Sequence, residues 1–502
     1  ARAVVIADGG YQANLELMRQ YVSPAPEKLL QRNAQTAKGD GLRMALDAGA
    51  AVRGMGRFYG HLHARDALTQ PLLWPNPVVD TIVAAGMRGG IGTLGRFRRR
   101  YARQAAARLP ESRAALFGKP RACMLSCQRD FREAAAMPKA KAAVLREIRA
   151  PMTIETLDVG PVGPGDVLVR VRAASLCHTD LEAIEGSLAV ALPAVLGHEA
   201  AGEIAEVGAA VTELGVGDRV VLSWNPHCGD CFYCDRGQPI LCRVFLSAGP
   251  KGFHFDGKPR LRCDTGDVHQ LMFLGGFSEY VVVSAQCAVR VPDAMPFDRA
   301  ALIGCGVMTG VGAAARIADM RWGDVAMVVG CGAVGLSAVQ GCAMGGATTV
   351  IAVDPNPARR QLAQAIGATH ACAPEDAAEL ARSLTDGRGA DAVVECAGVP
   401  AGFRLTLEAV RPGGQVVWMG KVAVNDEVAF RWGSMMQEKR ITRSSYGGAK
   451  PKTDFPLLAR AYLDGKLKLD EMISARIPIE AINDGFAALK RGETVRSVVM
   501  FG

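Results

Sequence analysis

The segment Gly330-Cys331-Gly332-Ala333-Val334-Gly335 decides the fold of the larger part of this chain. An apolar run, 325–329, precedes it and an apolar stretch to Met344 follows, which predicts a strand, a tight glycine turn and a helix. Asp354 lies nineteen residues after the last glycine, at the end of the next predicted strand, 349–353. In a βαβ unit with this pattern the helix N-terminus receives the pyrophosphate of a dinucleotide. We therefore predict a doubly wound parallel α/β domain that binds a dinucleotide.

The acidic residue also indicates which dinucleotide is bound. The carboxylate of Asp354 can accept hydrogen bonds from the adenosine ribose hydroxyls, but it would repel a 2′-phosphate. The sequence therefore favours NAD over NADP. The alternative for the glycine segment is a structural tight turn without a cofactor, which the flanking strand, helix and acid disfavour.

Outside this domain the pattern changes. From residue 137 to about 292, short strands alternate with Gly, Pro and Asp turns, which predicts an irregular β-rich domain. From about Gly304 the order becomes strand, helix, strand, and 393–398 and 414–419 are expected to be later strands of the parallel sheet.

Four cysteines are crowded into one loop with the spacing C-x2-C-x2-C-x7-C. Four thiolates at these spacings are typical of a tetrahedral zinc site with four sulfur ligands, which is closed and therefore structural. Two disulfides or four free thiols are the alternatives, and a reducing compartment together with the tight spacing disfavours them. The predicted ligands are Cys228, Cys231, Cys234 and Cys242.

A second set of candidate ligands is dispersed along the chain. Cys177 follows a predicted strand, His198 comes about 20 residues later, and Cys305 lies far downstream. Each is a weak signal alone, because buried Cys and lone His residues are common in protein cores. Together they match the two-Cys, one-His catalytic zinc set for which alcohol dehydrogenase is the standard example. Asp180 is well placed to receive the other N–H of His198 and so fix its tautomer.

These motifs, in this order, resemble the zinc-dependent medium-chain alcohol dehydrogenase family over about 137–502. The resemblance implies a GroES-like zinc catalytic domain, formed by 137–305 and 446–502, and a Rossmann NAD-binding domain, 306–445. It implies two Zn²⁺ per chain, NAD as cofactor, and reversible oxidation of a primary (aliphatic or aryl) alcohol to an aldehyde. It also implies a homodimer or homotetramer.

The resemblance also implies roles for single residues. They are Cys177, His198 and Cys305 as catalytic zinc ligands, Glu199 as the nearby carboxylate, Thr179 as acceptor of the alcohol proton, His178 on the pyrophosphate, Thr309 by the nicotinamide, Arg359 after the ribose-binding acid, Arg496 on the phosphates and Trp224 against the substrate.

Two positions distinguish this chain within the family. Glu182 stands five residues after Cys177, where many members have the His that ends the proton relay, so we expect the relay to end in a carboxylate or in water. Cys305 stands where the polyol dehydrogenase branch usually has Glu, which favours the alcohol branch. The family's insert after the structural zinc is expected near 245–273.

The first part of the chain is different in kind. Residues 1–87, with Gly9-Gly10 and Gly39-Asp40-Gly41, resemble an internal fragment of a fumarate-reductase-like FAD flavoprotein, but the glycine fingerprint for the FAD pyrophosphate is absent. Residues 88–136 form a basic linker with eleven Arg and one Lys against three acids. We interpret both as dispensable. An FAD-using fusion enzyme, or a protein that binds RNA or another partner through 88–136, is the alternative.

The composition and charge of the chain indicate which broad classes of protein it does not belong to. The chain has 502 residues, of which 49% are hydrophobic and 22% charged, a balance typical of globular proteins. No run of 18 apolar residues and no signal-peptide pattern is present, so we expect a cytoplasmic protein without a membrane span. The net charge of +8 comes from the basic linker, so nucleic-acid binding is not expected of the rest.

Overall fold

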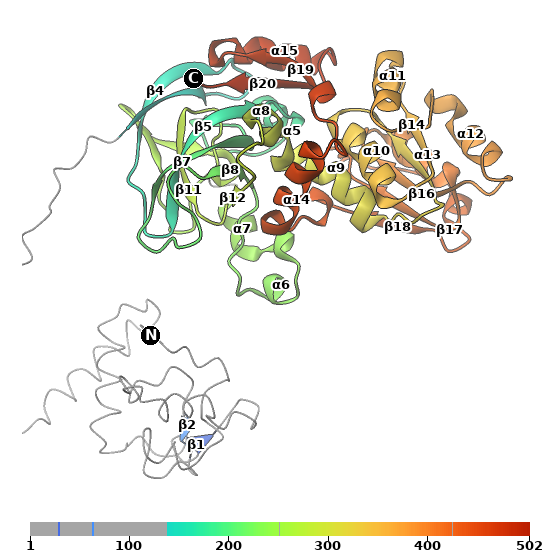
Figure 1. Cartoon of the computed structure of the whole chain (residues 1–502), viewed down its shortest axis with the longest axis horizontal. Coiled ribbons are helices and arrows are strands. Elements are labelled where there is room, and N and C mark those ends of the chain that lie inside the picture. Colours follow the sequence, from blue (N-terminus) through green and yellow to red (C-terminus); the bar gives the residue numbers. More distant parts are fainter. Residues whose placement is uncertain (1–28, 31–62, 65–137, 250–251, 424) are drawn as a thin grey trace, which may run out of the picture. The chain divides into compact units, whose positions relative to one another are not determined.

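The computed structural model describes residues 29–30, 63–64, 138–249, 252–423 and 425–502 (Figure 1). The chain divides into two units, Ala1–Phe131 and Arg132–Gly502. In the first unit the description consists of two short antiparallel strands, β1 (Leu29–Leu30) and β2 (His63–Ala64). The flavoprotein-like fragment and the basic linker predicted for 1–136 otherwise lie outside the described residues.

One lobe of the second unit is built on β-structure from both ends of that unit. A closed barrel has the strand order β10-β6-β3-β4-β9, and beside it a sheet has the order β12-β8-β7-β5-β20-β19, with β11 paired to β5. We call this part the barrel lobe. The strands are β3 (Lys139–Leu145), β4 (Thr153–Val159), β5 (Asp166–Ser175), β6 (Ala194–Val195), β7 (Glu199–Val207), β8 (Arg219–Leu222), β9 (Leu261–Cys263), β10 (Gly266–Gln270), β11 (Tyr280–Ser284), β12 (Ala288–Arg290), β19 (Ile473–Ile477) and β20 (Arg496–Met500).

The other lobe, here called the dinucleotide lobe, carries an all-parallel sheet with the order β15-β14-β13-β16-β17-β18. This is the 3-2-1-4-5-6 order of dinucleotide-binding folds, in which ligands bind at the carboxyl ends of the strands where the order reverses. The strands are β13 (Val325–Val329), β14 (Thr349–Val353), β15 (His370–Cys372), β16 (Ala390–Glu395), β17 (Val410–Trp418) and β18 (Arg440–Arg443).

Helices surround this sheet, and the first of them begins in the glycine segment. They are α10 (Ala333–Gly345), α11 (Pro357–Ala365), α12 (Ala377–Ser383) and α13 (Pro400–Ala409). Asn356 caps α11 by accepting a hydrogen bond from Ala358 N at 2.9 Å. The predicted doubly wound domain is confirmed, with its first two strands at the residues that the apolar runs indicate.

A buried helical segment, Phe297–Ile317, carries the third dispersed cysteine. It consists of α8 (Phe297–Leu302), the π-helical turn η6 (Ile303–Val307), α9 (Met308–Gly312) and a second π-helical turn, η7 (Ala313–Ile317). Within the described residues it is the one helix long and apolar enough to cross a membrane, but most of it is buried inside the protein. It packs closely on α10, because a Cβ at Gly341 would lie 2.7 Å from Val311 Cα. Its apolar surface is therefore protein core.

Candidate active site

Three segments far apart in the chain bring the dispersed ligands together. Cys177 lies between β5 and α5 (His178–Glu185), His198 directly precedes β7, and Cys305 lies on the π-helical turn. Their ligand atoms, and a carboxylate oxygen of Glu199, all lie within 4.8 Å of one another. This arrangement of two thiols, one imidazole and one carboxylate is compatible with a metal centre.

The hydrogen bonds of His198 fit metal ligation. His198 Nδ1 lies 3.0 Å from Asp180 Oδ1, which also accepts a hydrogen bond from Gly197 N at 2.9 Å. These contacts hold the imidazole with Nδ1 as the donor, so that Nε2 carries the lone pair. Nε2 is buried and has no hydrogen-bond partner among the described residues. A buried nitrogen without a partner is costly, and a zinc ion bound there would remove that cost.

The two thiols of this site are in unequal states. A hydrogen bond with Cys305 lowers the pKa of the Cys177 thiol well below its ordinary value, and the same contact raises the pKa of Cys305. One thiolate is thus already favoured before any metal adds its own charge. Because the thiolate is the form that ligates metals, the pair is suited to Zn²⁺.

Glu199 and Arg496 form a buried ion pair beside these thiols. Arg496 Nη2 lies 3.0 Å from Glu199 Oε1 and 3.7 Å from Cys177 Sγ, and Gly306 N donates to the same carboxylate oxygen at 3.2 Å. Burial raises the pKa of Glu199 to about 8, while Arg496 opposes this shift. The family resemblance predicts Arg496 on the cofactor phosphates, whereas the structure places its guanidinium beside Glu199 and Cys177, one of the predicted metal ligands. The phosphate contact stays a prediction.

A cavity of about 1010 Å³ joins this centre to the glycine segment. Most of the residues predicted for the catalytic, cofactor and substrate sites line it, and three of them, Asp180, Glu199 and Gly335, are not among the described residues that line it. The residues that line it are Cys177, His178, Thr179, Glu182, His198, Trp224, Cys305, Thr309, Gly330, Gly332, Ala333, Val334, Asp354, Arg359 and Arg496.

The glycines of the segment are required for different reasons. Gly330 has a φ of 91°, and a Cβ there would lie 2.7 Å from Ala397 N. A Cβ at Gly335 would lie 1.7 Å from Gly330 O, so this glycine allows the helix to pack on the strand. A Cβ at Gly332 would meet nothing within 4 Å, although this residue lines the cavity. The space beside Gly332 is what a close approach of a pyrophosphate to the backbone needs.

Asp354 is nearly buried at the end of β14. Its Oδ2 accepts a hydrogen bond from Cys331 N and its Oδ1 one from Asn356 N, both at 2.8 Å. These bonds hold the carboxylate at the edge of the cavity. Arg359 donates to Gly492 O at 3.1 Å, and Arg360 donates to Asp354 O at 2.7 Å.

The four-cysteine loop has the geometry of a second metal site. The Sγ atoms of Cys231 and Cys234 lie 3.6 Å apart, those of Cys228 and Cys242 also 3.6 Å, and those of Cys228 and Cys234 4.0 Å. A tetrahedral zinc with Zn–S bonds of about 2.3 Å places its sulfurs about 3.8 Å apart. All four are free cysteines, so the disulfide alternative does not hold in this structure.

Two aromatic side chains, Trp224 and Tyr446, line the same cavity as the candidate metal ligands. The ring centroid of Trp224 lies 4.3 Å from that of Tyr446 and 5.9 Å from that of Phe245, which belongs to the predicted insert. Tyr446 is buried and donates a hydrogen bond to Gly304 O, next to the third ligand. Met272, with a φ of 51°, lines the cavity from the end of the insert.

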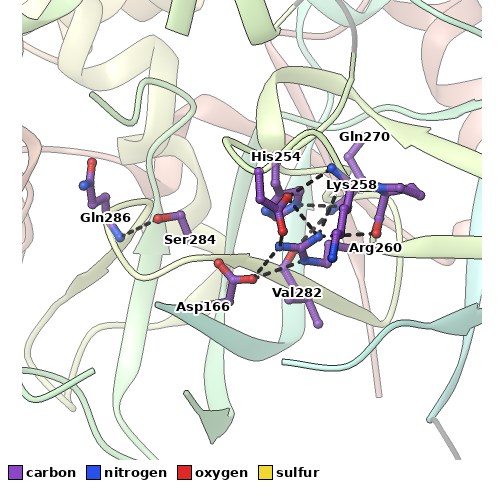
Figure 2. Close-up of polar contacts among 10 residues, drawn as sticks. Asp166, His254, Lys258, Arg260, Gln270, Val282, Ser284 and Gln286 are labelled. Carbon is purple, nitrogen blue, oxygen red and sulfur yellow. Dashed lines mark hydrogen bonds and ion pairs between the residues drawn. The ribbon is translucent and has the colours of Figure 1, made fainter. Parts of the chain in front are cut away.

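A charge cluster around the buried Arg260 joins the predicted insert to β5 of the barrel lobe (Figure 2). Arg260 Nη2 donates to Asp166 Oδ2 at 2.8 Å and to Asp256 Oδ2 at 3.0 Å. Next to it, His254 Nε2 lies 3.2 Å from Gln270 Oε1, and the Gln270 amide donates to Leu274 O at 2.9 Å. Gln270 directly precedes the turn that carries Met272, so the cluster fixes one wall of the cavity.

Sequence reasoning missed Tyr446, Met272 and Lys421, which also line the cavity. Lys421 follows the carboxyl end of β17, the edge at which parallel sheets bind ligands, and that position could have identified it. Lys421 Nζ donates to Glu182 Oε2. Glu182, which with water is one of the two predicted ends of the proton relay, is thus an ion-paired carboxylate, and its role in a relay stays a prediction. No comparable local signal marks Tyr446 or Met272.

Comparison with known proteins agrees with this geometry. Two family models match: Alcohol dehydrogenase GroES-like domain over 163–293 and Zinc-binding dehydrogenase over 333–463. The NDMA-dependent alcohol dehydrogenase of Amycolatopsis methanolica is 38% identical over 367 residues, which cover 72% of this chain and 99% of that protein. The S-(hydroxymethyl)glutathione dehydrogenase of Candida maltosa is 35% identical over 72% of this chain and 96% of its own length.

A solved structure shows the same similarity. The benzyl alcohol dehydrogenase of Acinetobacter calcoaceticus superposes with a TM-score of 0.69 at 30% identity, and the match covers 73% of this chain and all of that one. The two matched family regions leave out residues 1–87, and nothing in these comparisons supports the flavoprotein resemblance predicted there.

Proposed function

The chain belongs to the zinc-dependent medium-chain alcohol dehydrogenase family, and from this premise we propose that it oxidises a primary alcohol to an aldehyde with NAD. One observation carries the proposal. The Cys177, His198 and Cys305 cluster opens on the same cavity as the glycine segment and Asp354. An alcohol beside these three residues and a nicotinamide could therefore be held together in one cavity.

The residues of this site would have separate roles in metal binding, in orienting His198 and in proton transfer. Cys177, His198 and Cys305 would hold Zn²⁺, which when bound supplies Lewis-acid stabilisation of an alkoxide, and NAD when bound supplies the hydride acceptor. Asp180 holds the His198 ring with Nε2 free to ligate. Thr179, which lines the cavity two residues after the first ligand, would accept the alcohol proton and pass it towards Glu182 or water.

Two features support NAD as the cofactor. The carboxylate of Asp354 is held at the cavity edge, where a 2′-phosphate would be repelled. The basic side chains nearest to Asp354 along the chain are those of Arg359 and Arg360. Both donate hydrogen bonds to backbone carbonyl oxygens instead of pointing freely at the place of a 2′-phosphate. A guanidinium free to pair with a 2′-phosphate would favour NADP instead.

The experiment is a substrate panel followed at the NADH absorbance band. Straight-chain alcohols, benzyl alcohol and a polyol are each offered with NAD and with NADP. We expect turnover of primary alcohols with NAD and a much lower kcat/KM with NADP and with the polyol. Zinc-loaded protein that turns over the polyol but no primary alcohol would overturn the proposal.

We also propose that residues 137–502 are the whole enzyme, working as a homodimer or homotetramer in the cytoplasm. The matched relatives correspond to 72% of this chain and nearly their own full length. The twelve cysteines in the described part are free, as expected in a reducing compartment. A chain of 137–502 should keep the zinc content and kcat/KM of the full chain, and its mass in solution should be two or four protomers. More than a tenfold loss of kcat/KM would show that 1–136 contributes.

A further inference from the structure

Glu182 and Lys421 come from different lobes and meet at the cofactor cavity. Glu182 lies on α5 of the barrel lobe, and Lys421 follows β17 of the dinucleotide lobe, 239 residues later in the chain. Lys421 Nζ donates to Glu182 Oε2, and both residues line the cavity. The ion pair therefore crosses from one lobe to the other beside the space assigned to NAD.

The backbone on each side of this pair is held in place. Ser187 N and Leu188 N donate to Glu182 O at 3.0 and 3.1 Å, which closes the end of α5. On the other side, Gly398 packs so closely on the next loop that a Cβ there would lie 2.7 Å from Lys421 O. Glu395 Oε1 accepts hydrogen bonds from Ala397 N and Gly398 N at 2.9 and 2.8 Å, which fixes that contact. The two backbones are thus anchored within their own lobes.

The exposure of the pair places it at the rim of the cavity. The side chains of Lys421 and Glu182 are 46% and 31% exposed. Water and ions reach both groups, so the pair can open and can be screened by salt. An exposed ion pair of this kind changes the equilibrium constant between its open and closed states by up to about fivefold.

We propose that the Glu182–Lys421 ion pair is a latch across the cofactor cavity that slows the release of NADH. The latch rests on the proposed function, because it acts on the cofactor of that reaction. A dinucleotide that leaves between the lobes must pass a rim that this pair closes, so the pair has to open first. Opening of such closures and release of product limit turnover in many enzymes.

The test measures the NADH dissociation rate of the full chain by stopped-flow fluorescence, with excess NAD as competitor. Lys421→Met and Glu182→Gln should each raise the rate about two- to fivefold. The charge-reversed double variant, Glu182→Lys with Lys421→Glu, should return it to the wild-type rate. Salt of about 0.5 M should raise the NADH dissociation rate of the wild type by a larger factor than that of Lys421→Met, because it screens the ion pair only in the wild type and the contacts to the cofactor phosphates in both.

A matched control is available in the same chain. Lys452 Nζ lies 2.9 Å from Glu213 Oε2, an exposed ion pair outside the cavity-lining residues. Lys452→Met should leave the NADH dissociation rate unchanged.

The outcomes of this test distinguish a failure of the latch proposal from a failure of the proposed function on which it rests. Unchanged rates in both single variants, or faster release that charge reversal does not correct, would overturn the latch. Wild-type protein that binds no NADH would overturn the proposed cofactor instead. Because the readout is binding and not turnover, a role of Glu182 in proton transfer does not affect the result.

Discussion

The hydrogen bond between Asp180 and His198 should control both metal affinity and turnover. The Asp180 carboxylate is fully buried, and its Oδ1 accepts from His198 Nδ1 and Gly197 N. Asp180→Asn keeps the shape and one oxygen acceptor but removes the negative charge. It also puts an NH2 group where the buried Oδ2 atom now has no hydrogen-bond partner among the described residues.

The size of the effect follows from these contacts. Loss of a carboxylate that orients a zinc-bound histidine typically lowers metal affinity or activity by ten- to a hundredfold, or about 1.4–2.7 kcal/mol. A buried donor without a partner costs a further 1–3 kcal/mol, roughly, in the free energy of unfolding. Asp180→Ala should be the more destabilising change, because it leaves Gly197 N and His198 Nδ1 without their acceptor.

The assay is zinc content after dialysis against a graded chelator series, together with kcat/KM and melting temperature. Asp180→Asn should lose one zinc at a lower chelator concentration than the wild type and keep the zinc of the four-cysteine loop. Asp464→Asn, an exposed carboxylate near Lys466, is the control and should behave as wild type. If Asp180→Asn keeps wild-type zinc affinity and kcat/KM, the argument that this carboxylate orients His198 is refuted.

Three further predictions follow from the same geometry. Metal analysis should find two zinc ions per wild-type chain and one in Cys305→Ser, whereas equal counts would contradict the assignment of that ligand. Asp354→Gly should raise kcat/KM with NADP relative to NAD by at least about tenfold, since the repulsion of the 2′-phosphate is removed. Burial lowers the pKa of His254 to about 4, so the folded state favours the neutral imidazole. The resulting stability is present above a pH of about 6.5 and is lost, by about 3 kcal/mol, as the pH falls from about 6.5 to about 4. His254→Gln should flatten the melting temperature over that pH range, and an unchanged slope would count against this account.

Local sequence signals predicted the dinucleotide lobe and the four-cysteine loop well. The strand, glycine turn and helix around Gly330–Gly335 are encoded within a few residues, and the four cysteines of the candidate structural zinc site fall within one loop. The candidate ligands Cys177, His198 and Cys305 are identified through the family resemblance, because nothing local joins three residues that only the folded chain brings together.

Contacts between distant charged side chains were beyond the same reasoning. Arg496 lies on Glu199, 297 residues earlier in the chain, and a buried guanidinium goes where a carboxylate can pair with it. The family resemblance offers Glu182 or water as the end of the proton relay, but the ion pair of Glu182 depends on Lys421 in the other lobe. Sequence spacing shows which groups a segment offers, and the partners they meet depend on the packing of both lobes.

The segment Gly304-Cys305-Gly306 shows how packing makes a site from an ordinary-looking cysteine. It lies on a π-helical turn, and such turns inside α-helices are frequent at functional sites. A Cβ at position 304 would lie 2.9 Å from Leu222 O, and one at 306 would lie 2.7 Å from Arg496 Nη2. The two glycines thus let a buried helix come close to β8 on one side and to the Glu199–Arg496 pair on the other. On this helical turn the Cys305 sulfur lies within 4.8 Å of the other candidate ligand atoms, so the two glycines support the packing of the candidate metal site although neither offers a ligand atom.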